Sequence, residues 1–276
     1  MSLPRHARLQ ARLDALESAG RKALVPFVTA GDPSLAATVP VMHALVEAGA
    51  DVLELGVPFS DPMADGPVIQ RSSERALARG AGIRYVLECV RGFRERDQAT
   101  PVVLMGYLNP VEIRGPASFA AAAADAGVDG VLLVDLPPEE ADEYRAAFAL
   151  NGLALISLAS PTTPEARLQR LVTQADGYLY YVSFAGVTGA DRLDVGDAGQ
   201  RLQGLRTMAA IPVYAGFGIR DAHSAAAMAA HADGVVVGSA LVSALDGSLD
   251  EAEAAQRAVA FLRPLRQALD GLAVAA

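Results

Sequence analysis

The sequence predicts an α/β fold, a single (β/α)8 TIM barrel with an extra N-terminal helix. Eight short runs rich in Val, Leu and Ile alternate with longer, alanine-rich stretches that have the composition of helices. Each run is almost continuously apolar, which is typical of parallel strands with both faces buried. No Ser/Gly-rich linker or abrupt change of composition divides the chain. We therefore expect one domain that spans residues 1–276.

The predicted elements follow one another as strand and helix along the whole chain. The predicted strands are Ala23–Thr29, Asp51–Val57, Pro101–Tyr107, Gly130–Asp135, Leu153–Ala159, Tyr178–Ser183, Pro212–Ala215 and Gly234–Val237. The predicted helices between them include Leu35–Ala48, Val68–Arg79, Ala117–Ala126, Glu139–Leu150, Glu165–Gln174 and Ala222–Ala230, several of which end at a glycine. Met1 to Gly20 mixes charged and apolar residues, which predicts the extra helix and argues against a secretory signal.

Four strands are preceded by similar short turns of small and polar residues. Asp51, Asp129, Asp176 and Asp233 stand in these turns, three of them directly before a glycine. We interpret them as the turns that lead from a helix into a strand at one end of the barrel. The matches are too short to establish an internal repeat. In a barrel of this kind the active site lies at the other end, where the strands finish.

Composition and charge exclude several classes of function. Apolar residues make up 52% of the chain and charged residues 20%, which excludes a disordered chain. The formal net charge of -9 disfavours nucleic acid and acidic membrane surfaces as partners. Cys89 is the only cysteine, so the chain has no internal disulfide and fits a reducing, cytoplasmic compartment. The four histidines lack metal-ligand spacing, and we expect no metal site and no membrane span.

Glu54 is the most unusual residue of the second predicted strand. The strand is otherwise apolar, and a buried carboxylate is costly unless it is paired, neutral or functional. Because side chains alternate along a strand, Val52, Glu54 and Gly56 share one face, which we expect to point into the barrel. Burial there would raise the pKa of Glu54 and suit it to proton transfer near neutral pH. The alternative is a structural carboxylate that accepts hydrogen bonds from a loop.

Two aspartates lie in the loop that follows this strand. Asp65 ends a Pro- and Gly-rich segment just before a predicted helix, so it is a candidate for catalysis or for capping that helix. Asp61 lies earlier in the same loop and is interpreted as a turn residue or as part of a partner surface.

Glycine-bearing turns follow the last three predicted strands. They are Phe184–Gly189, Ala215–Gly218 and Val237–Ala240, the last of which opens a helix. Glycine allows backbone N–H groups to approach an oxyanion, and a helix N-terminus adds a favourable dipole. Together the three turns predict a phosphate site without a lysine.

Several segments resemble the tryptophan synthase alpha chain family. The segment Leu53–Gln70 reads LELGVPFSDPMADGPVIQ and is similar to the family signature at nearly every position. Four later blocks resemble the family in the same order, namely Met105–Pro110, Asp135–Glu140, Pro161–Pro164 and Gly186–Gly189. The resemblance extends from Pro26 to Ser239, and the segment after the second strand carries most of its specificity.

The resemblance implies a lyase of L-tryptophan biosynthesis that cleaves indole-3-glycerol phosphate to indole and glyceraldehyde 3-phosphate by a retro-aldol reaction. It implies that Asp65 accepts a hydrogen bond from the indole N–H and that Glu54 carries protons between the ring carbon and the glycerol hydroxyl. Thr188 resembles the family's lid residue, which meets Asp65 when the loop closes. The resemblance places the indole against Phe27, Tyr107, Leu132, Leu158 and Tyr180, and the phosphate at Gly189, Gly218, Gly238 and Ser239.

The family also implies a partner, a pyridoxal-phosphate-dependent beta chain in an alpha2-beta2 heterotetramer, with Asp61 and Asn109-Pro110 near the contact. We expect no cofactor in this chain, because pyridoxal phosphate belongs to the beta chain and the only lysine here is Lys22, before the first strand. Two alternatives remain open. One is a free-standing lyase or isomerase that works without a beta chain. The other is a barrel without catalysis that only activates its partner, and the presence of both Glu54 and Asp65 argues against it.

Overall fold

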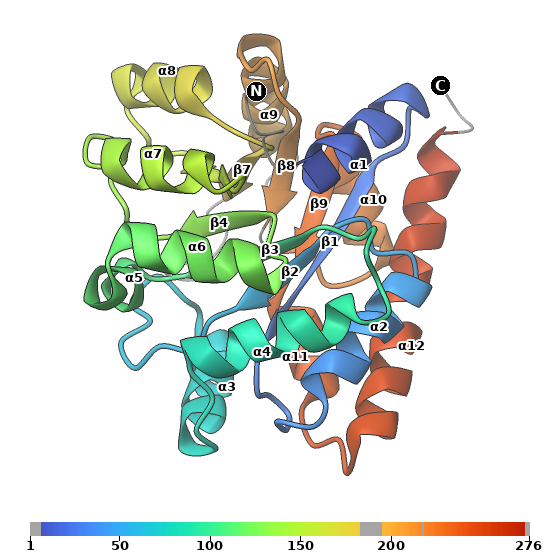
Figure 1. The fold of residues 1–276 in the computed structure, drawn as a ribbon. Coiled ribbons are helices and arrows are strands. Elements are labelled where there is room, and N and C mark those ends of the chain that lie inside the picture. The colour runs from blue at the N-terminus through green and yellow to red at the C-terminus, as the bar shows by residue number, and fades with distance from the viewer. Residues whose placement is uncertain (1–6, 183–194, 217, 274–276) are drawn as a thin grey trace.

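A parallel β-barrel forms the centre of the protein. The computed structural model describes residues 7–182, 195–216 and 218–273 (Figure 1). The strands form one sheet in the order β5-β4-β3-β2-β1-β9-β8-β7-β6, and neighbouring strands are parallel. Their bounds are β1 Ala23–Thr29, β2 Leu53–Gly56, β3 Val102–Gly106, β4 Gly130–Leu133, β5 Ala154–Leu155, β6 Ser157–Ala159, β7 Leu179–Val182, β8 Val213–Gly216 and β9 Gly234–Val237.

The fifth predicted strand, Leu153–Ala159, is present as two pieces. β5 pairs with β4 and β6 pairs with β7, and only Ile156 separates the two pieces along the chain. Since β5 and β6 are also the two ends of the sheet order, this strand closes the barrel. All eight predicted strand regions are present in the described residues, and the ninth strand results from this division.

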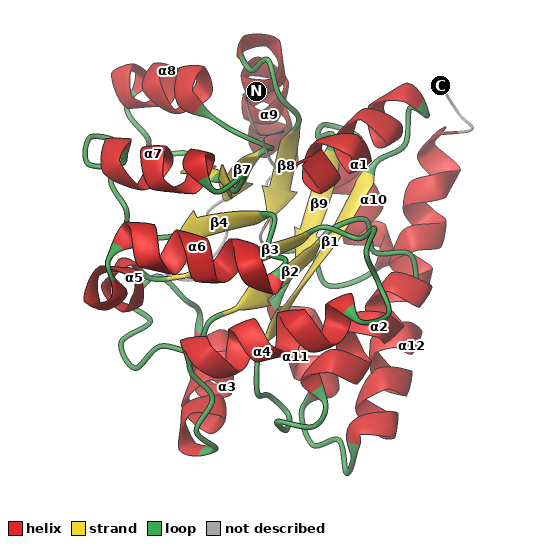
Figure 2. Ribbon diagram, viewed as in Figure 1, coloured by secondary structure: helices red, strands yellow, loops and turns green. Residues whose placement is uncertain are grey.

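Helices surround the strands (Figure 2). Their bounds within the described residues are α1 Ala7–Ser18, α2 Thr38–Glu47, α3 Pro67–Ala78, α4 Ile83–Arg94, α5 Leu108–Arg114, α6 Pro116–Ala126, α7 Asp142–Leu150, α8 Glu165–Gln174, α9 Val195–Met208, α10 Ala222–Ala229, α11 Ser239–Leu245 and α12 Glu251–Ala273. The predicted starts at Leu35 and Glu139 are three residues too early. Turns occupy both places, since the N–H of Ala37 bonds to Ser34 and that of Glu140 bonds to Pro137.

Alternation along the strands divides the apolar residues into two layers. Val25, Val52 and Val103 belong to the cluster inside the barrel. Leu53 and Leu55 belong to the larger cluster between the strands and the helices. The predicted inward direction of the face that carries Glu54 is therefore confirmed, because Val52 shares that face.

The helix α1 covers the end of the barrel where the strands begin. Its buried residues Leu9, Leu13 and Leu16 join the inner cluster. A Cβ on Gly177, in the turn before β7, would lie 2.9 Å from the Leu9 side chain, so the helix packs closely against this end. The extra N-terminal helix of the prediction thus seals the barrel opposite to the predicted active site.

The aspartate-bearing turns lie at this same end of the barrel. Asp51 accepts a hydrogen bond from the N–H of Leu24 at 2.9 Å, and Asp129 accepts one from Val102 at 2.8 Å. Asp233 accepts one from Val213 at 3.0 Å. In each case the aspartate precedes one strand and bonds to the start of the strand before it. The similarity of the turns therefore reflects a repeated structural contact between neighbouring strands.

Candidate active site

Glu54 lies inside the barrel and is fully buried. Its Oε1 accepts a hydrogen bond of 2.9 Å from the Tyr178 hydroxyl, whereas Oε2 has no partner among the described residues. Burial raises the pKa of Glu54 to about 7, against the opposing effect of the Tyr178 hydrogen bond. At neutral pH this group is therefore divided between its acid and its carboxylate form, as a proton carrier requires.

Tyr178 was not among the site residues predicted from the sequence. It is fully buried and its ring stacks on that of Tyr214, with centroids 4.5 Å apart. The sequence contains a signal for it, since Tyr178 shares a strand face with the predicted residue Tyr180. Which tyrosine reaches Glu54 depends on the curvature of the closed barrel and is visible only in the structure.

Asp65 lies at the mouth of the barrel, in the loop between β2 and α3. Its Oδ2 accepts a hydrogen bond of 3.0 Å from the Tyr107 hydroxyl, and the same hydroxyl accepts the N–H of Ala64 at 3.0 Å. Burial is the main cause that raises the pKa of Asp65 to about 6, and the Tyr107 hydrogen bond opposes it. Tyr107, at the end of β3, thus holds both the loop and its carboxylate.

The role of helix cap is excluded for the Asp65 side chain. The N-cap residue of α3 is Gly66, and no side chain caps that helix among the described residues. Instead Gln70, in the first turn of α3, donates to the backbone oxygens of Pro62 at 3.3 Å and Asp65 at 2.9 Å. These bonds hold the backbone of the loop and leave the Asp65 carboxylate directed toward Tyr107.

The two carboxylates belong to one electrostatic environment. Burial raises the pKa of Tyr180 well above its ordinary value, and the charges of Glu54 and Asp65 both raise it further. The phenol of Tyr180 is therefore close to both groups. The side chain of Tyr180 also needs the absence of a side chain at Gly216, where a Cβ would lie 2.2 Å from the tyrosine oxygen.

The other residues predicted to contact the indole lie in or beside the barrel interior. Phe27 and Tyr107 line a small cavity at the carboxyl ends of β1 to β3, together with Asp65. A Cβ on Gly56 would lie 2.5 Å from the Phe27 ring, so this glycine makes room for it. Leu132 belongs to the inner cluster and Leu158 packs against it. The structure thus brings these apolar side chains to the same region as the carboxylates.

The described part of the predicted phosphate site lies at the carboxyl ends of β8 and β9. Gly218 follows β8 with a positive φ of 75°, and Gly238 is the N-cap of α11, whose first residue is Ser239. Thr188 and Gly189 lie outside the described residues. Within the described residues, no group of three or more His, Cys, Asp or Glu side chains could hold a metal ion. None of the helices searched there is long and apolar enough to cross a membrane.

Comparison with known proteins assigns the chain to a family. A profile of the tryptophan synthase alpha chain family matches residues 13–270. The chain belongs to this family. As a tryptophan synthase alpha chain family member it is a lyase.

Similar members of the tryptophan synthase alpha chain family include two proteins from Xanthomonas. The alpha chain of Xanthomonas campestris pv. campestris (strain B100) is 70% identical over 264 residues, which cover 95% of this chain and 97% of the relative. That of Xanthomonas oryzae pv. oryzae (strain MAFF 311018) is also 70% identical, with coverages of 95% and 98%. Such identity confirms the family resemblance and supports the role of an alpha subunit rather than that of a free-standing lyase.

Solved structures of the family have the same fold. The tryptophan synthase subunit alpha of Legionella pneumophila str. Paris superposes with a TM-score of 0.89 at 46% identity, covering 96% of this chain and 98% of that one. A chain of the Mycobacterium tuberculosis tryptophan synthase gives a TM-score of 0.85 at 37% identity, with coverages of 95% and 98%. The predicted TIM-barrel class is confirmed.

Proposed function

We propose that this chain cleaves indole-3-glycerol phosphate to indole and glyceraldehyde 3-phosphate by a retro-aldol reaction. One observation carries the proposal beyond family membership. Two carboxyl groups, Glu54 inside the barrel and Asp65 at its mouth, both have a pKa raised by burial, and neither forms an ion pair among the described residues. Raised carboxyl pKa values in a partly closed site are typical of acid–base catalysis.

The proposed chemistry assigns a different task to each carboxylate. The protonated Glu54 donates its proton to the ring carbon that bears the glycerol chain, and the Asp65 carboxylate stabilises the positive charge at the indole N–H. Glu54 then removes the proton from the hydroxyl on the adjacent chain carbon. The carbon–carbon bond breaks, its electron pair returns to the ring, and the hydroxyl carbon becomes the aldehyde. Each cycle restores Glu54 to its protonated form.

Binding of the substrate is proposed for the residues around these groups. Phe27, Tyr107, Leu132, Leu158 and Tyr180 would enclose the indole, since all five are buried or partly buried at the barrel interior or its mouth. For the phosphate we propose the backbone at Gly189, Gly218, Gly238 and Ser239. Thr188 would close over Asp65. The position of Gly238 and Ser239 at the start of α11 supports the phosphate site, because the first N–H groups of a helix have no partner within the helix and no side chain of the described residues caps this one.

The partner proposed for this chain is a beta chain in an alpha2-beta2 heterotetramer, which would hold the pyridoxal phosphate. Two exposed apolar side chains support a contact beside the active site. Met63 lies in the β2–α3 loop with 79% of its surface exposed, and Ile113 lies in α5 with 81% exposed. The bond between Ala64 and Tyr107 joins these two segments. We also propose a cytoplasmic location, which the tryptophan pathway and the single cysteine support, and one domain over residues 1–276, which the single sheet supports.

The proposal is tested by indole release from the purified chain, with and without beta chain. We expect slow release by the chain alone, faster release with beta chain, and a loss of about 10²–10⁴-fold in Asp65→Asn. Glu139→Gln is the control, because Glu139 is exposed and pairs with Arg167 at the surface. Equal rates for Asp65→Asn and the wild type would refute the catalytic role of Asp65. Indole release that beta chain leaves unchanged would favour the free-standing lyase.

The partner surface is tested separately with Ile113→Asp. A charge in the centre of a contact weakens association, so we expect activation by beta chain to need at least tenfold more of it. The rate of the isolated chain should stay that of the wild type. Leu249→Asp is the matched control, because Leu249 is 91% exposed but belongs to the segment between α11 and α12.

A further inference from the structure

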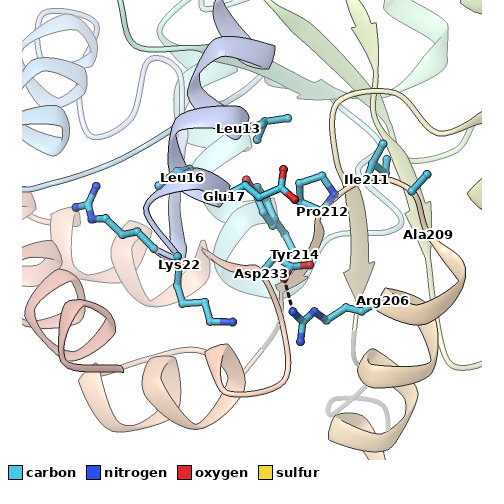
Figure 3. A pocket seen from close by; sticks show the side chains of 13 residues that line it. Leu13, Leu16, Glu17, Lys22, Arg206, Ala209, Ile211, Pro212, Tyr214 and Asp233 are labelled. Carbon is cyan, nitrogen blue, oxygen red and sulfur yellow. Dashed lines mark ion pairs between the residues drawn. The ribbon is translucent and has the colours of Figure 1, made fainter. Parts of the chain in front are cut away.

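A second cavity lies at the end of the barrel opposite to the candidate active site. Its volume is about 410 Å³. It is bounded by the last turns of α1, the residues before β1, the end of α9 and the turns before β8 and β9 (Figure 3). The small cavity that Asp65 lines contains none of these segments. Nothing in the proposed reaction uses this second cavity.

Charged side chains of both signs face this cavity. Figure 3 shows Lys22 and Arg206 ending on one side of it, whereas the Glu17 carboxylate lies on the other side beside Pro212. Asp233 forms an ion pair of 2.8 Å with Arg206. Arg21, which also lines the cavity, is already paired with Asp51 and Asp270.

Lys22 is a cation without a counter-charge in direct contact within the described part of the chain. Its Nζ donates to the backbone oxygen of Ala232 at 2.7 Å, and among the described residues no carboxylate oxygen lies within 4.0 Å of it. Burial lowers the pKa of Lys22, and the nearby Arg206 lowers it further, against the effect of Asp233. A half-buried ammonium of this kind gains most from an added carboxylate.

Glu17 is an anion without a partner at the other side of the cavity, within the described part of the chain. No hydrogen bond or ion pair joins its carboxylate to another side chain in the described part of the chain, and it is exposed on α1. Glu17 and Asp233 both oppose the binding of a simple anion, and Lys22 and Arg206 oppose the binding of a simple cation. A ligand that carries both charges avoids both penalties.

The remaining wall of the cavity is apolar. Leu13 and Leu16 from α1 face Ile211, Pro212 and Tyr214 from the start of β8 (Figure 3). Such a wall contributes affinity because the apolar side chain of a ligand leaves water when it packs against the wall.

We propose that this cavity binds a free α-amino acid with an apolar or aromatic side chain. The carboxylate of the ligand pairs with Lys22 and Arg206, and its ammonium group pairs with Glu17. Its side chain lies against the wall formed by Leu13, Leu16, Ile211, Pro212 and Tyr214. The cavity volume accommodates a side chain as large as an indole. The site is independent of the proposed reaction.

The test is equilibrium binding of L-tryptophan and L-leucine to the full chain by calorimetry. The chain contains no tryptophan, so the fluorescence of bound L-tryptophan can also be read without background. We expect one site per chain and at least tenfold weaker binding in Lys22→Gln and in Glu17→Gln. Tryptamine, which lacks the carboxylate, and indole-3-propionate, which lacks the amine, should each bind the wild type at least tenfold more weakly than L-tryptophan.

Two control variants show whether binding belongs to this cavity. Arg167→Gln removes an exposed cation that is not among the residues lining the cavity and should leave binding unchanged, as should Asp65→Asn. Thermal melting of Lys22→Gln and Glu17→Gln should match that of the wild type. Binding that Asp65→Asn abolishes, equal binding of tryptamine or indole-3-propionate, unchanged binding in the Lys22 and Glu17 variants, or no binding of either amino acid would each overturn the proposal. Failure here would leave indole release by the chain unaffected.

Discussion

The amino end of the barrel and its interior hold buried carboxylates in opposite surroundings. At the amino end, Asp129 pairs with Arg94 at 2.8 Å and with Arg8 at 3.0 Å, and it also accepts a backbone N–H. Asp51 is held in the same way by several arginines and a backbone N–H. Inside the barrel, Glu54 accepts one tyrosine hydroxyl and has one oxygen without a partner among the described residues.

This difference separates the paired carboxylates from the two that we propose to be catalytic. Burial raises the pKa of Asp51 and Asp129 as well, but arginines and backbone N–H groups oppose that rise. At Glu54 and at Asp65 a tyrosine hydroxyl is the opposing group that the described residues supply. A carboxylate with guanidinium partners stays charged and joins elements, whereas one with a single neutral donor can exchange a proton near neutral pH.

The largest effect is expected inside the barrel, for Glu54→Gln. Glutamine keeps the shape and can still accept the Tyr178 hydrogen bond, but it cannot carry a proton. We expect indole formation in the presence of beta chain to fall by about 10³-fold or more. Wild-type turnover by a correctly folded Glu54→Gln chain would contradict the assignment.

At the amino end, Asp129→Asn should reduce stability instead of activity. The change leaves the Arg94 guanidinium, whose side chain is 8% exposed, without its charged partner. We expect a loss of about 3–5 kcal/mol in the free energy of unfolding, measured by urea denaturation. Indole release per folded molecule should remain that of the wild type. The same loss in Glu139→Gln, at an exposed pair, would show that burial is not the cause.

The pH dependence of stability distinguishes the two kinds of carboxylate further. Because the folded-state pKa of Glu54 is raised to about 7 from 4.5, the folded chain binds more protons than the unfolded chain between these values. The free energy of unfolding therefore falls as pH rises through this window. Glu54→Gln should remove this contribution and be more stable than the wild type by up to ~3 kcal/mol above pH 7. Below pH 4.5 the advantage should vanish, and a constant difference at all pH values would contradict the raised pKa.

The smallest expected effect concerns the Tyr178 hydroxyl. Tyr178→Phe removes the hydrogen bond that lowers the pKa of Glu54, so that pKa should rise by about one pH unit. Carbon-13 NMR of labelled glutamate side chains measures it. Tyr181→Phe is the matched control, because that ring belongs to the outer cluster. A pKa that stays at its wild-type value in Tyr178→Phe would show that the hydrogen bond does not tune Glu54.

Local sequence patterns were sufficient to predict the positions of the strands and which of their side chains point into the barrel. The alternation of Val52, Glu54 and Gly56 against Leu53 and Leu55 predicted the inward direction of Glu54 without any tertiary information. The helix Glu165–Gln174 was predicted with the bounds it has in the structure. The predicted helix starts were less accurate. The segments Ser34–Ala37 and Pro137–Glu140 have helix-like sequences, but each forms a turn with one backbone hydrogen bond between its first and last residue.

The sequence by itself determined the barrel class and the family and singled out the two candidate carboxylates, because each of these follows from short-range periodicity or from one contiguous segment. Three features depended on the tertiary structure: the bond from Tyr178 to Glu54, the contact of Tyr107 with Asp65, and the cavity between α1 and α9. Tyr178 and Glu54 are 124 positions apart in the chain. Only closure of the barrel brings such residues together, and the partners that each buried carboxylate then meets decide whether it keeps its charge.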